Sequence, residues 1–316
     1  MTKKLKHLIY EQVLNLSMKP YDLAVFWEWD YDRAFNHLLQ EESDRQRLNI
    51  LFVSPKELDS CLQKIRQKET RFRWFLDRAS ETDLRFLPLL EACRRRHFEA
   101  INCPMQGKKA VCKSHMHRLL QKAKVPLPET LIIPPKVKAA ELPFFTFETL
   151  GIPFVLKPAM GGGGDGVHLG QSELSQIQAA RSEYPNDEYL VQQTIVPDTH
   201  RSLAMWFRVY FICGEVLLSF WDPKTRAYTP LDEQAVKDLP VRKIKQLAQA
   251  IARLSKLRFF SSEMAISGGQ LVVVDYSNDP VDLRPKTDHR DGIPACLLKH
   301  IVESLVRFIR LHKKRG

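Results

Sequence analysis

A lysine followed by a run of glycines stands near the middle of the chain. Lys157 ends the apolar segment 154–156 and is followed by Pro158. The glycines are Gly161, Gly162, Gly163 and Gly164. Because glycine has no side chain, its backbone N–H groups can close around phosphate oxygens, and Lys157 adds a positive charge at the strand end. The pattern therefore predicts a phosphate-binding loop between two strands.

Two common phosphate-binding motifs do not fit this segment. A Walker loop has its lysine after the glycines and leads into a helix, whereas Lys157 precedes them. The dinucleotide fingerprint also opens a helix, and no helix is expected on these glycines. A glycine run alone is equally typical of a mobile hairpin turn, but the lysine and the residues downstream favour the phosphate loop.

Oxygen-bearing side chains gather in the last third of the chain. Glu263 lies in one expected strand, Asp275 ends the next, and Gly268-Gly269 forms the turn between them. Asn278 follows three residues later. Mg²⁺ prefers oxygen ligands and commonly shares its coordination sphere with nucleotide phosphates. The segment predicts a magnesium site, and a solvated hairpin with a polar exit is the alternative.

Composition places these residues in a globular protein of more than one domain. A chain of 316 residues predicts two or three domains, and its 44% hydrophobic and 27% charged residues are typical of soluble proteins. No apolar stretch approaches the roughly 20 residues of a membrane span. The basic N-terminus lacks the features of a signal peptide. Six scattered cysteines without a Cys-x-x-Cys motif predict free thiols in the cytoplasm.

The net charge of +11 does not by itself identify the class of binding partner. Nucleic acid binds basic proteins, but the chain has no zinc finger, no basic zipper and no interleaved aromatic and basic residues. The excess charge fits a nucleotide site and an anionic substrate at least as well. We expect no nucleic-acid partner and no membrane partner, and a homodimer is compatible with the sequence.

The elements that must position these residues follow from the apolar pattern. Strands expected at 22–27, 48–53, 72–76 and 98–101 alternate with helices, which predicts a parallel α/β domain over residues 1–104. A helix is expected from about 109 to 123, the glycine hairpin follows, and a strand at 188–195 comes after the next helix. Two further hairpins, at 203–221 and 259–275, flank a helix. A last helix is expected at 295–311.

Taken in this order, the residues resemble the ATP-grasp enzymes, which include D-alanine–D-alanine ligase, glutathione synthetase and the glutamate ligase that modifies a ribosomal protein. The resemblance covers residues 105–310, about two-thirds of the chain. It implies an α/β protein whose ATP-grasp part is α+β, with mixed or antiparallel sheets enclosing the nucleotide. Residues 1–104 would form the parallel pre-ATP-grasp domain. Residues 105–195 would form the subdomain with the glycine loop, and 196–316 the subdomain with the metal site.

The resemblance also implies roles for single residues. Lys113 and Lys157 resemble the two ATP lysines; Lys108 and Lys109 compete with Lys113, which the spacing favours. Arg208 stands where the family has a basic residue facing phosphate or substrate. The segment that resembles the adenine-binding hinge is Gln192, Gln193, Thr194 and Ile195. The residues that resemble the Mg²⁺ ligands are Glu263, Asp275 and Asn278.

Three departures from the family pattern stand out. Gln193 replaces the usual hinge glutamate, so that ribose recognition either falls to Asp198 or is altered. The last metal pair is Asp275-x-x-Asn278 rather than carboxylate-x-Asn, so that either the strand bulges or Ser277 takes the asparagine's place. Trp206 and Phe207 precede Arg208 where the family often has an acidic residue.

The resemblance implies ATP- and Mg²⁺-dependent ligation of a small-molecule carboxylate to an amine or related nucleophile through an acylphosphate. A kinase on the same fold and a non-catalytic nucleotide-binding protein are the alternatives. Arg284 and Arg290, in a loop after the metal segment, are candidates for binding substrate, although a solvated loop fits them equally well. His115 and His117, two residues apart on a helix, face different ways and are not expected to form a metal pair.

Overall fold

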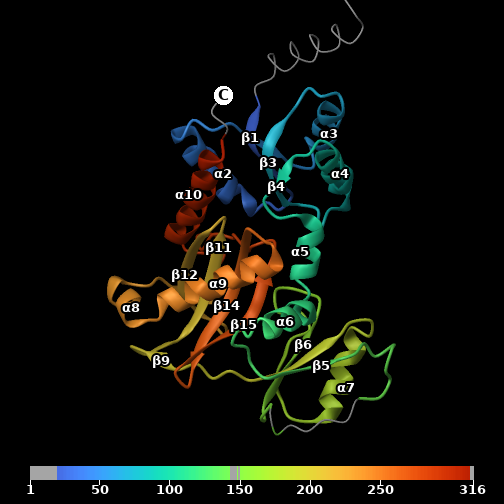
Figure 1. Ribbon diagram of the computed structural model, residues 1–316, viewed down its shortest axis with the longest axis vertical. Coiled ribbons are helices and arrows are strands. Elements are labelled where there is room, and N and C mark those ends of the chain that lie inside the picture. Colours follow the sequence, from blue (N-terminus) through green and yellow to red (C-terminus); the bar gives the residue numbers. More distant parts are fainter. Residues whose placement is uncertain (1–19, 143–147, 149, 314–316) are drawn as a thin grey trace, which may run out of the picture. The chain divides into compact units, whose positions relative to one another are not determined.

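The computed structural model describes residues 20–142, 148 and 150–313 (Figure 1). Its backbone contacts divide the chain into two units. The first unit combines Met1–Asn102 with Asp282–Gly316, and the second is Cys103–Val281. Both contain helices and strands, which confirms the predicted α/β class.

A parallel sheet with strand order β2-β1-β3-β4 forms the centre of the first unit. The interior of β1, residues 23–26, is fully buried, as expected for a parallel strand covered by helices on both faces. The strands are β1 (Tyr21–Trp27), β2 (Ile50–Val53), β3 (Phe72–Arg78) and β4 (Glu99–Ala100). The helices are α2 (Asp32–Arg45), α3 (Leu58–Arg66), the short 3₁₀ helix η1 (Leu84–Phe86), α4 (Leu87–Arg95) and α10 (Ala295–Leu311).

The last helix belongs to this first unit, whereas the sequence assigned residues 282–316 to the third domain. α10 packs against α2, and the Phe308 ring lies edge-on to Trp74 of β3 at 4.9 Å between centroids. Apolar residues recur along one stripe of α10, with Ile301 and Leu305 fully buried. The chain therefore returns to its first sheet after it completes the second unit.

Two antiparallel sheets form the second unit. The smaller sheet has strand order β5-β8-β6-β7, with β5 (Thr130–Ile133), β6 (Phe154–Pro158), β7 (His168–Gln171) and β8 (Tyr189–Gln193). The larger sheet has strand order β13-β12-β11-β14-β15. Its strands are β11 (Trp206–Ile212), β12 (Glu215–Asp222), β13 (Ala227–Thr229), β14 (Phe259–Ser267) and β15 (Gln270–Asn278). A short hairpin, β9 (Thr199–His200) and β10 (Leu203–Ala204), links the two sheets along the chain.

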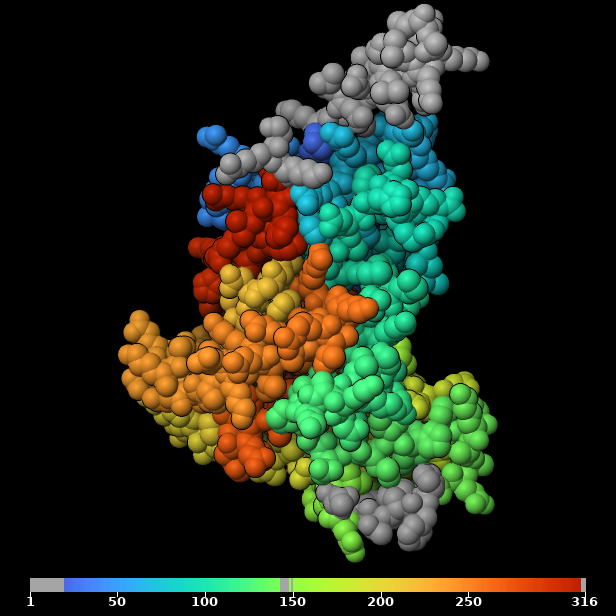
Figure 2. Space-filling model, viewed as in Figure 1, coloured from blue at the N-terminus to red at the C-terminus, as the bar shows by residue number. Residues whose placement is uncertain are grey.

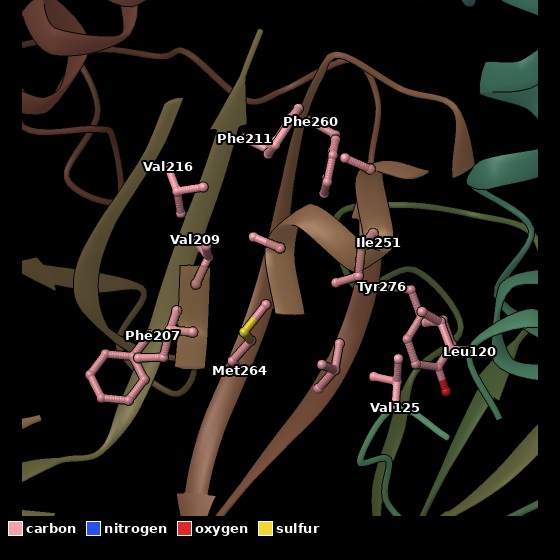
Figure 3. Packing of buried hydrophobic residues seen from close by; sticks show 14 of the residues in the cluster. Leu120, Val125, Phe207, Val209, Phe211, Val216, Ile251, Phe260, Met264 and Tyr276 are labelled. Carbon is pink, nitrogen blue, oxygen red and sulfur yellow. The ribbon is translucent and has the colours of Figure 1, made fainter. Parts of the chain in front are cut away.

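Helices cover these sheets and close their cores. α9 (Val241–Ser255) packs on β11 and β15 (Figure 1). α6 (Lys113–Lys122) contacts both α9 and β15, and Figure 2 shows the surfaces of α6 and α9 side by side. Ile251 of α9 and Leu120 of α6 enter one apolar cluster with the sheet residues Phe207 and Met264 (Figure 3). The remaining helices are α5 (Pro104–Ala110), α7 (Leu174–Glu183) and α8 (Glu233–Asp238).

The helix expected at 109–123 is two helices, α5 and α6. The break lies at Cys112, whose backbone is extended, and the next N–H, that of Lys113, donates to Ala159 O at 2.7 Å. A contact between residues 46 positions apart therefore replaces the local helical bond. The break makes Lys113 the first residue of α6.

The hairpin of β14 and β15 is irregular where its acidic residues lie. Glu263 pairs with Asp275, but Ser261 pairs with Asn278 and Met264 with Val273. Between these pairs, β15 advances three residues from Asp275 to Asn278 while β14 advances two, from Glu263 to Ser261. In the other direction, β15 advances two residues from Asp275 to Val273 while β14 advances one, from Glu263 to Met264. β15 therefore carries an extra residue on each side of Asp275, which is the pattern of a β-bulge.

All six cysteines are free thiols, as the sequence predicted. Within residues 20–142, 148 and 150–313, no helix has the length and apolar character that crossing a membrane requires.

Candidate phosphate and metal site

Lys157 connects the two sheets of the second unit. It lies in β6, and its Nζ donates to Gln192 Oε1 of β8 at 2.8 Å and to Val274 O of β15 at 3.3 Å. Burial lowers the pKa of Lys157, the carboxylates of Asp275 and Glu263 oppose that shift, and Lys113 adds to it. An ammonium group has three N–H donors, so these two acceptors leave one for a further partner.

Lys113 approaches the same place from the start of α6. Its Nζ donates to Gly161 O, the first carbonyl of the glycine run, at 2.5 Å. The structure thus brings Lys113 and Lys157 to one site, whereas Lys108 and Lys109 lie on α5 and are exposed.

The glycine loop connects β6 to β7 and adopts a conformation that glycine allows. Gly161, Gly163 and Gly164 have φ values of 107°, 65° and 92°, which residues with a Cβ rarely adopt. Arg226, from the turn between β12 and β13, donates to Gly163 O at 3.2 Å. Lys113 and Arg226 therefore each bind a carbonyl group of this loop.

The bulge in β15 brings the side chains of Asp275 and Asn278 together. Asn278 Nδ2 donates to Asp275 Oδ2 at 3.0 Å, and Glu263 lies opposite Asp275 in the register. Ser277 faces elsewhere, because its buried Oγ donates to Ala110 O at 2.6 Å. Of the two alternatives for the unusual spacing, the structure has the bulged strand.

Arg208 of β11 and Trp206 share the carboxylate of Glu263. Arg208 forms an ion pair with Glu263 at 3.0 Å, and Trp206 Nε1 donates to the other carboxylate oxygen at 2.9 Å. The Arg208 guanidinium also lies over the Trp221 ring, 4.5 Å from its centroid. Burial acts to lower the pKa of Arg208, but the charge of Glu263 and neighbouring groups raises it. Arg208 therefore stays charged.

The Asp275 carboxylate is held ionised by its neighbours. Burial acts to raise its pKa, but the charges of Lys113 and Lys157 lower it, and Asn278 and Arg208 add to that effect, so that the pKa lies below its usual range. Three cations, Lys113, Lys157 and Arg208, thus accompany two carboxylates, Glu263 and Asp275. The difference of one positive charge favours an anionic ligand.

The donor set fits a metal ion that shares its sphere with a ligand. Among the described residues, no group of three or more histidine, cysteine, aspartate or glutamate side chains is placed to hold a metal alone. Two carboxylates with one amide oxygen match Mg²⁺, which usually completes its sphere with water and substrate phosphates.

The four hinge residues at the end of β8 divide into two pairs. Gln192 and Gln193 are in the strand; the Gln193 N–H donates to Glu129 O at 2.8 Å. Thr194 and Ile195 follow it, and the buried Thr194 Oγ1 has no hydrogen-bond partner among the described residues. Arg208 Nε is buried and has no partner in the same part of the chain. Such atoms are rare in folded proteins and indicate positions for a ligand or water.

Asp198, expected as one candidate for ribose recognition, is hydrogen-bonded at a hairpin turn. Its two carboxylate oxygens accept from Gly268 N at 2.8 Å and Gly269 N at 2.7 Å, at the turn of the β14–β15 hairpin. This turn lies five residues from Glu263, which corresponds to roughly 17 Å along a strand. Asp198 therefore stabilises the turn in this structure, and its role in ribose recognition stays a prediction.

The two loop arginines belong to the first unit. Arg284 is held by Asp282 at 2.8 Å and Asp291 at 3.1 Å, so its guanidinium already has carboxylate partners. Arg290 is exposed. The second unit contains the other candidate residues, and the role of the two arginines in binding substrate stays a prediction.

Sequence reasoning missed a buried pair of side chains beside this site. Tyr276, next to Asp275, bonds both Gln192 and His117 through its hydroxyl group. His117 is buried and His115 is exposed, which agrees with the expectation that they do not form a metal pair. The only sequence signal was a histidine on the apolar face of α6.

Three of the solved structures that resemble this chain each cover about nine-tenths of it. An ATP-grasp protein with a RimK domain from Sphaerobacter thermophilus matches with 20% identity and a TM-score of 0.60, covering 90% of this chain and 99% of the other. D-alanine–D-alanine ligase from Bacillus anthracis, complexed with ATP, matches with 13% identity and a TM-score of 0.58, covering 92% and 98%. The ATP-grasp ligase PsnB, complexed with a precursor peptide and AMPPNP, matches with 16% identity and a TM-score of 0.55, covering 92% and 99%.

No protein-family model matches the chain, and no curated protein matches it. At these identities, the agreement lies in the fold rather than in the sequence. The parallel sheet of the first unit, the two antiparallel sheets of the second and the three structural matches together confirm the resemblance drawn from the motifs. The chain has the ATP-grasp fold.

Proposed function

We propose that this protein is an ATP- and Mg²⁺-dependent ligase that joins a carboxylate to an amine or a similar nucleophile. The observation that carries the proposal is the meeting of three cations and two carboxylates where α6, β6, β11, β14 and β15 come together. The similar structures supply the reaction class, because those with a stated activity are ligases and two were solved with ATP or AMPPNP.

The nucleotide would bind between the two sheets of the second unit. Lys113 and Lys157 would contact its phosphates, and the backbone N–H groups of residues 161–164 would close over them. The hinge, residues 192–195, would bind the adenine, with the unpartnered Thr194 hydroxyl as one contact. Residues 105–195 and 196–281 would then be the two ATP-grasp subdomains.

Glu263, Asp275 and Asn278 are the residues that would hold Mg²⁺, whose charge would offset the charge that develops on the transferred phosphoryl group. PsnB has been solved with Mg and ADP, which supports this choice of metal. Glu263 is at present shared by Arg208 and Trp206, so Arg208 would turn toward phosphate or substrate when the metal takes the carboxylate.

The reaction would occur in two steps. A carboxylate oxygen of the first substrate attacks the γ-phosphorus, and the bond to the β–γ bridging oxygen breaks, so that ADP leaves. The amine then attacks the acyl carbon, the bond to the phosphate oxygen breaks, and inorganic phosphate leaves while the amine loses a proton. The protein contributes position and charge rather than covalent chemistry.

A coupled screen tests this function. Purified protein, ATP and Mg²⁺ would be mixed with pools of amino acids, small carboxylic acids and short peptides, and ADP release would be measured with and without hydroxylamine. We expect ADP release with at least one pool and a hydroxamate in the hydroxylamine arm, with neither in Lys157→Ala. ADP release without hydroxamate would point to phosphorylation of an alcohol, and failure to bind ATP would contradict the nucleotide site.

A further inference from the structure

A line of buried hydrogen bonds runs from α6 to Lys157. His117 Nδ1 lies 2.6 Å from the Tyr276 hydroxyl, which lies 3.2 Å from Gln192 Nε2. On the other side of the same amide, Gln192 Oε1 accepts from Lys157 Nζ at 2.8 Å. Tyr276 stands at the edge of the apolar cluster, near Leu120 and Val125 (Figure 3).

The direction of each bond follows from the available protons. The Thr130 hydroxyl donates to Pro128 O at 2.8 Å, so toward Gln192 Nε2, 3.1 Å away, it can only accept. The amide group therefore donates to Thr130 and to Tyr276. With its oxygen lone pair taken by the amide, Tyr276 directs its own proton to His117.

His117 is suited to accept that proton. Burial lowers the pKa of His117 to about 4, with a smaller effect from Arg118 in the same direction, so the imidazole is neutral near pH 7. A neutral imidazole with its proton on Nε2 presents an acceptor at Nδ1.

The opposite orientation of the Gln192 amide would be unfavourable at both ends. Its NH₂ group would meet the Lys157 ammonium, donor against donor, and its oxygen would meet the Thr130 hydroxyl oxygen, whose proton is directed to Pro128 O. We infer that His117 and Tyr276 are positioning residues that fix the orientation of the Gln192 amide, so that its oxygen always faces Lys157 and aims the ammonium group. Val274 O is the second fixed acceptor, and together they direct the remaining N–H of Lys157.

Replacing glutamine by glutamate gives a sharp test, because a carboxylate presents oxygen on both sides and needs no orientation. Nucleotide affinity, which rests on the proposed function, would be measured in four proteins: wild type, Tyr276→Phe, Gln192→Glu and the double variant. In the glutamine background, Tyr276→Phe should weaken ATP-analogue binding roughly tenfold. In the glutamate background, Tyr276→Phe should change the affinity for the ATP analogue less than about twofold. Both proteins in this second comparison carry the added negative charge of the Gln192→Glu change, so that charge does not contribute to the difference.

The control is Tyr189→Phe, on the same strand as Gln192. Its buried hydroxyl donates to Ala180 O at 2.6 Å, so the variant loses a comparable buried bond away from Lys157. We expect unchanged nucleotide affinity in it. An equal loss from Tyr276→Phe in both backgrounds would mean that Tyr276 has only a structural role and would overturn the inference.

A second measurement needs no nucleotide. In wild type both side-chain N–H groups of Gln192 are bonded, so their NMR signals should exchange slowly with solvent. Exchange should quicken at least about tenfold in Tyr276→Phe and not in Tyr189→Phe. Fast exchange in wild type would refute the fixed orientation even if ATP binds, whereas slow exchange without ATP binding would leave the orientation intact and contradict only the proposed function.

Discussion

At the scale of single residues, the site balances three cations against two carboxylates, and these residues come from different elements. Lys157 was predictable because it ends an apolar strand before glycines, and Asp275 because it ends another. The bonds of Gln192 with Tyr276 were not predictable, because they join residues 84 positions apart through a neutral amide. The hydrogen bonds of Asp198 were not predictable for a similar reason, since its partners lie on a distant hairpin turn.

Loss of either lysine should weaken nucleotide binding without unfolding the protein. Lys157→Ala and Lys113→Ala each remove a charge-assisted contact to phosphate, worth on the order of 1.5–3 kcal/mol. Lys108→Ala is the control, because that exposed lysine was the alternative to Lys113 in the sequence. Titration calorimetry with ATP would measure the three affinities, and wild-type affinity in both site variants would disprove the assignment of the site.

Asp275→Asn should reduce turnover more than it reduces ATP affinity. A metal ligand at this position stabilises mainly the transition state of phosphoryl transfer. Its loss therefore raises the activation free energy more than the dissociation constant for ATP. Steady-state kinetics at saturating Mg²⁺ and ATP would show kcat falling with a smaller change in KM. Normal turnover in this variant would exclude Asp275 as a ligand.

His117 should make the protein sensitive to acid. Its pKa is about 4 in the folded state and 6.5 as its ordinary value, so the unfolded state binds more protons between these limits. The stability it contributes is complete above about pH 6.5 and is lost as the pH falls toward 4. Between pH 7 and 4.5 this loss is about 2 kcal/mol.

Urea unfolding at both pH values would measure this effect. His117→Gln should reduce the difference in unfolding free energy between pH 7 and 4.5 by that amount, and the exposed His115→Gln should leave it unchanged. An identical pH dependence in wild type and His117→Gln would show that folding does not shift the pKa of His117.

At the scale of elements, hairpins were predicted better than helix ends. The Gly268-Gly269 turn and the glycine loop lie between the expected strands, because glycine marks turns by its backbone alone. The break between α5 and α6 was not predictable from the local sequence, because it depends on a hydrogen bond from Lys113 N to Ala159 O, a residue far along the chain. The bulges in β15 also depend on the partner strand, so the sequence left two alternatives there.

The glycine loop should become ordered when nucleotide binds. Its N–H groups gain phosphate partners, and closure would exclude water from an acylphosphate. Hydrogen exchange of residues 158–168 should slow with a non-hydrolysable ATP analogue and Mg²⁺. Arg226→Ala should speed exchange in the same residues without nucleotide, because it removes the bond to Gly163 O. Unchanged exchange at saturating analogue would return the loop to an ordinary hairpin turn.

At the scale of the whole molecule, the chain builds its second unit as one continuous segment, residues 103–281, and then returns to the first. The apolar stripe of α10 predicted the helix but not its packing partner, because such a stripe indicates burial without indicating against which element. Assigning it by position along the chain placed it in the wrong unit.

Substitutions in the two cores should act on different units. Leu305→Ala in α10 should cost about 2–5 kcal/mol and increase hydrogen exchange in β1 and β3, because Leu305 is fully buried. Ile251→Ala in α9 is the reciprocal variant, and its effect should be confined to β11, β14 and β15. Increased exchange in the larger antiparallel sheet from Leu305→Ala would contradict the division into units.

The bulged end of β15 has a consequence for how this segment tolerates insertions and deletions. A regular strand turns residues 275 and 278 to opposite faces, yet here they are bonded to each other. The two residues between them also form hydrogen bonds, Tyr276 with Gln192 and Ser277 with Ala110 O. Losing one residue here would restore the spacing usual in the family but break one of these bonds, so the segment should accept replacements more readily than any change in its length.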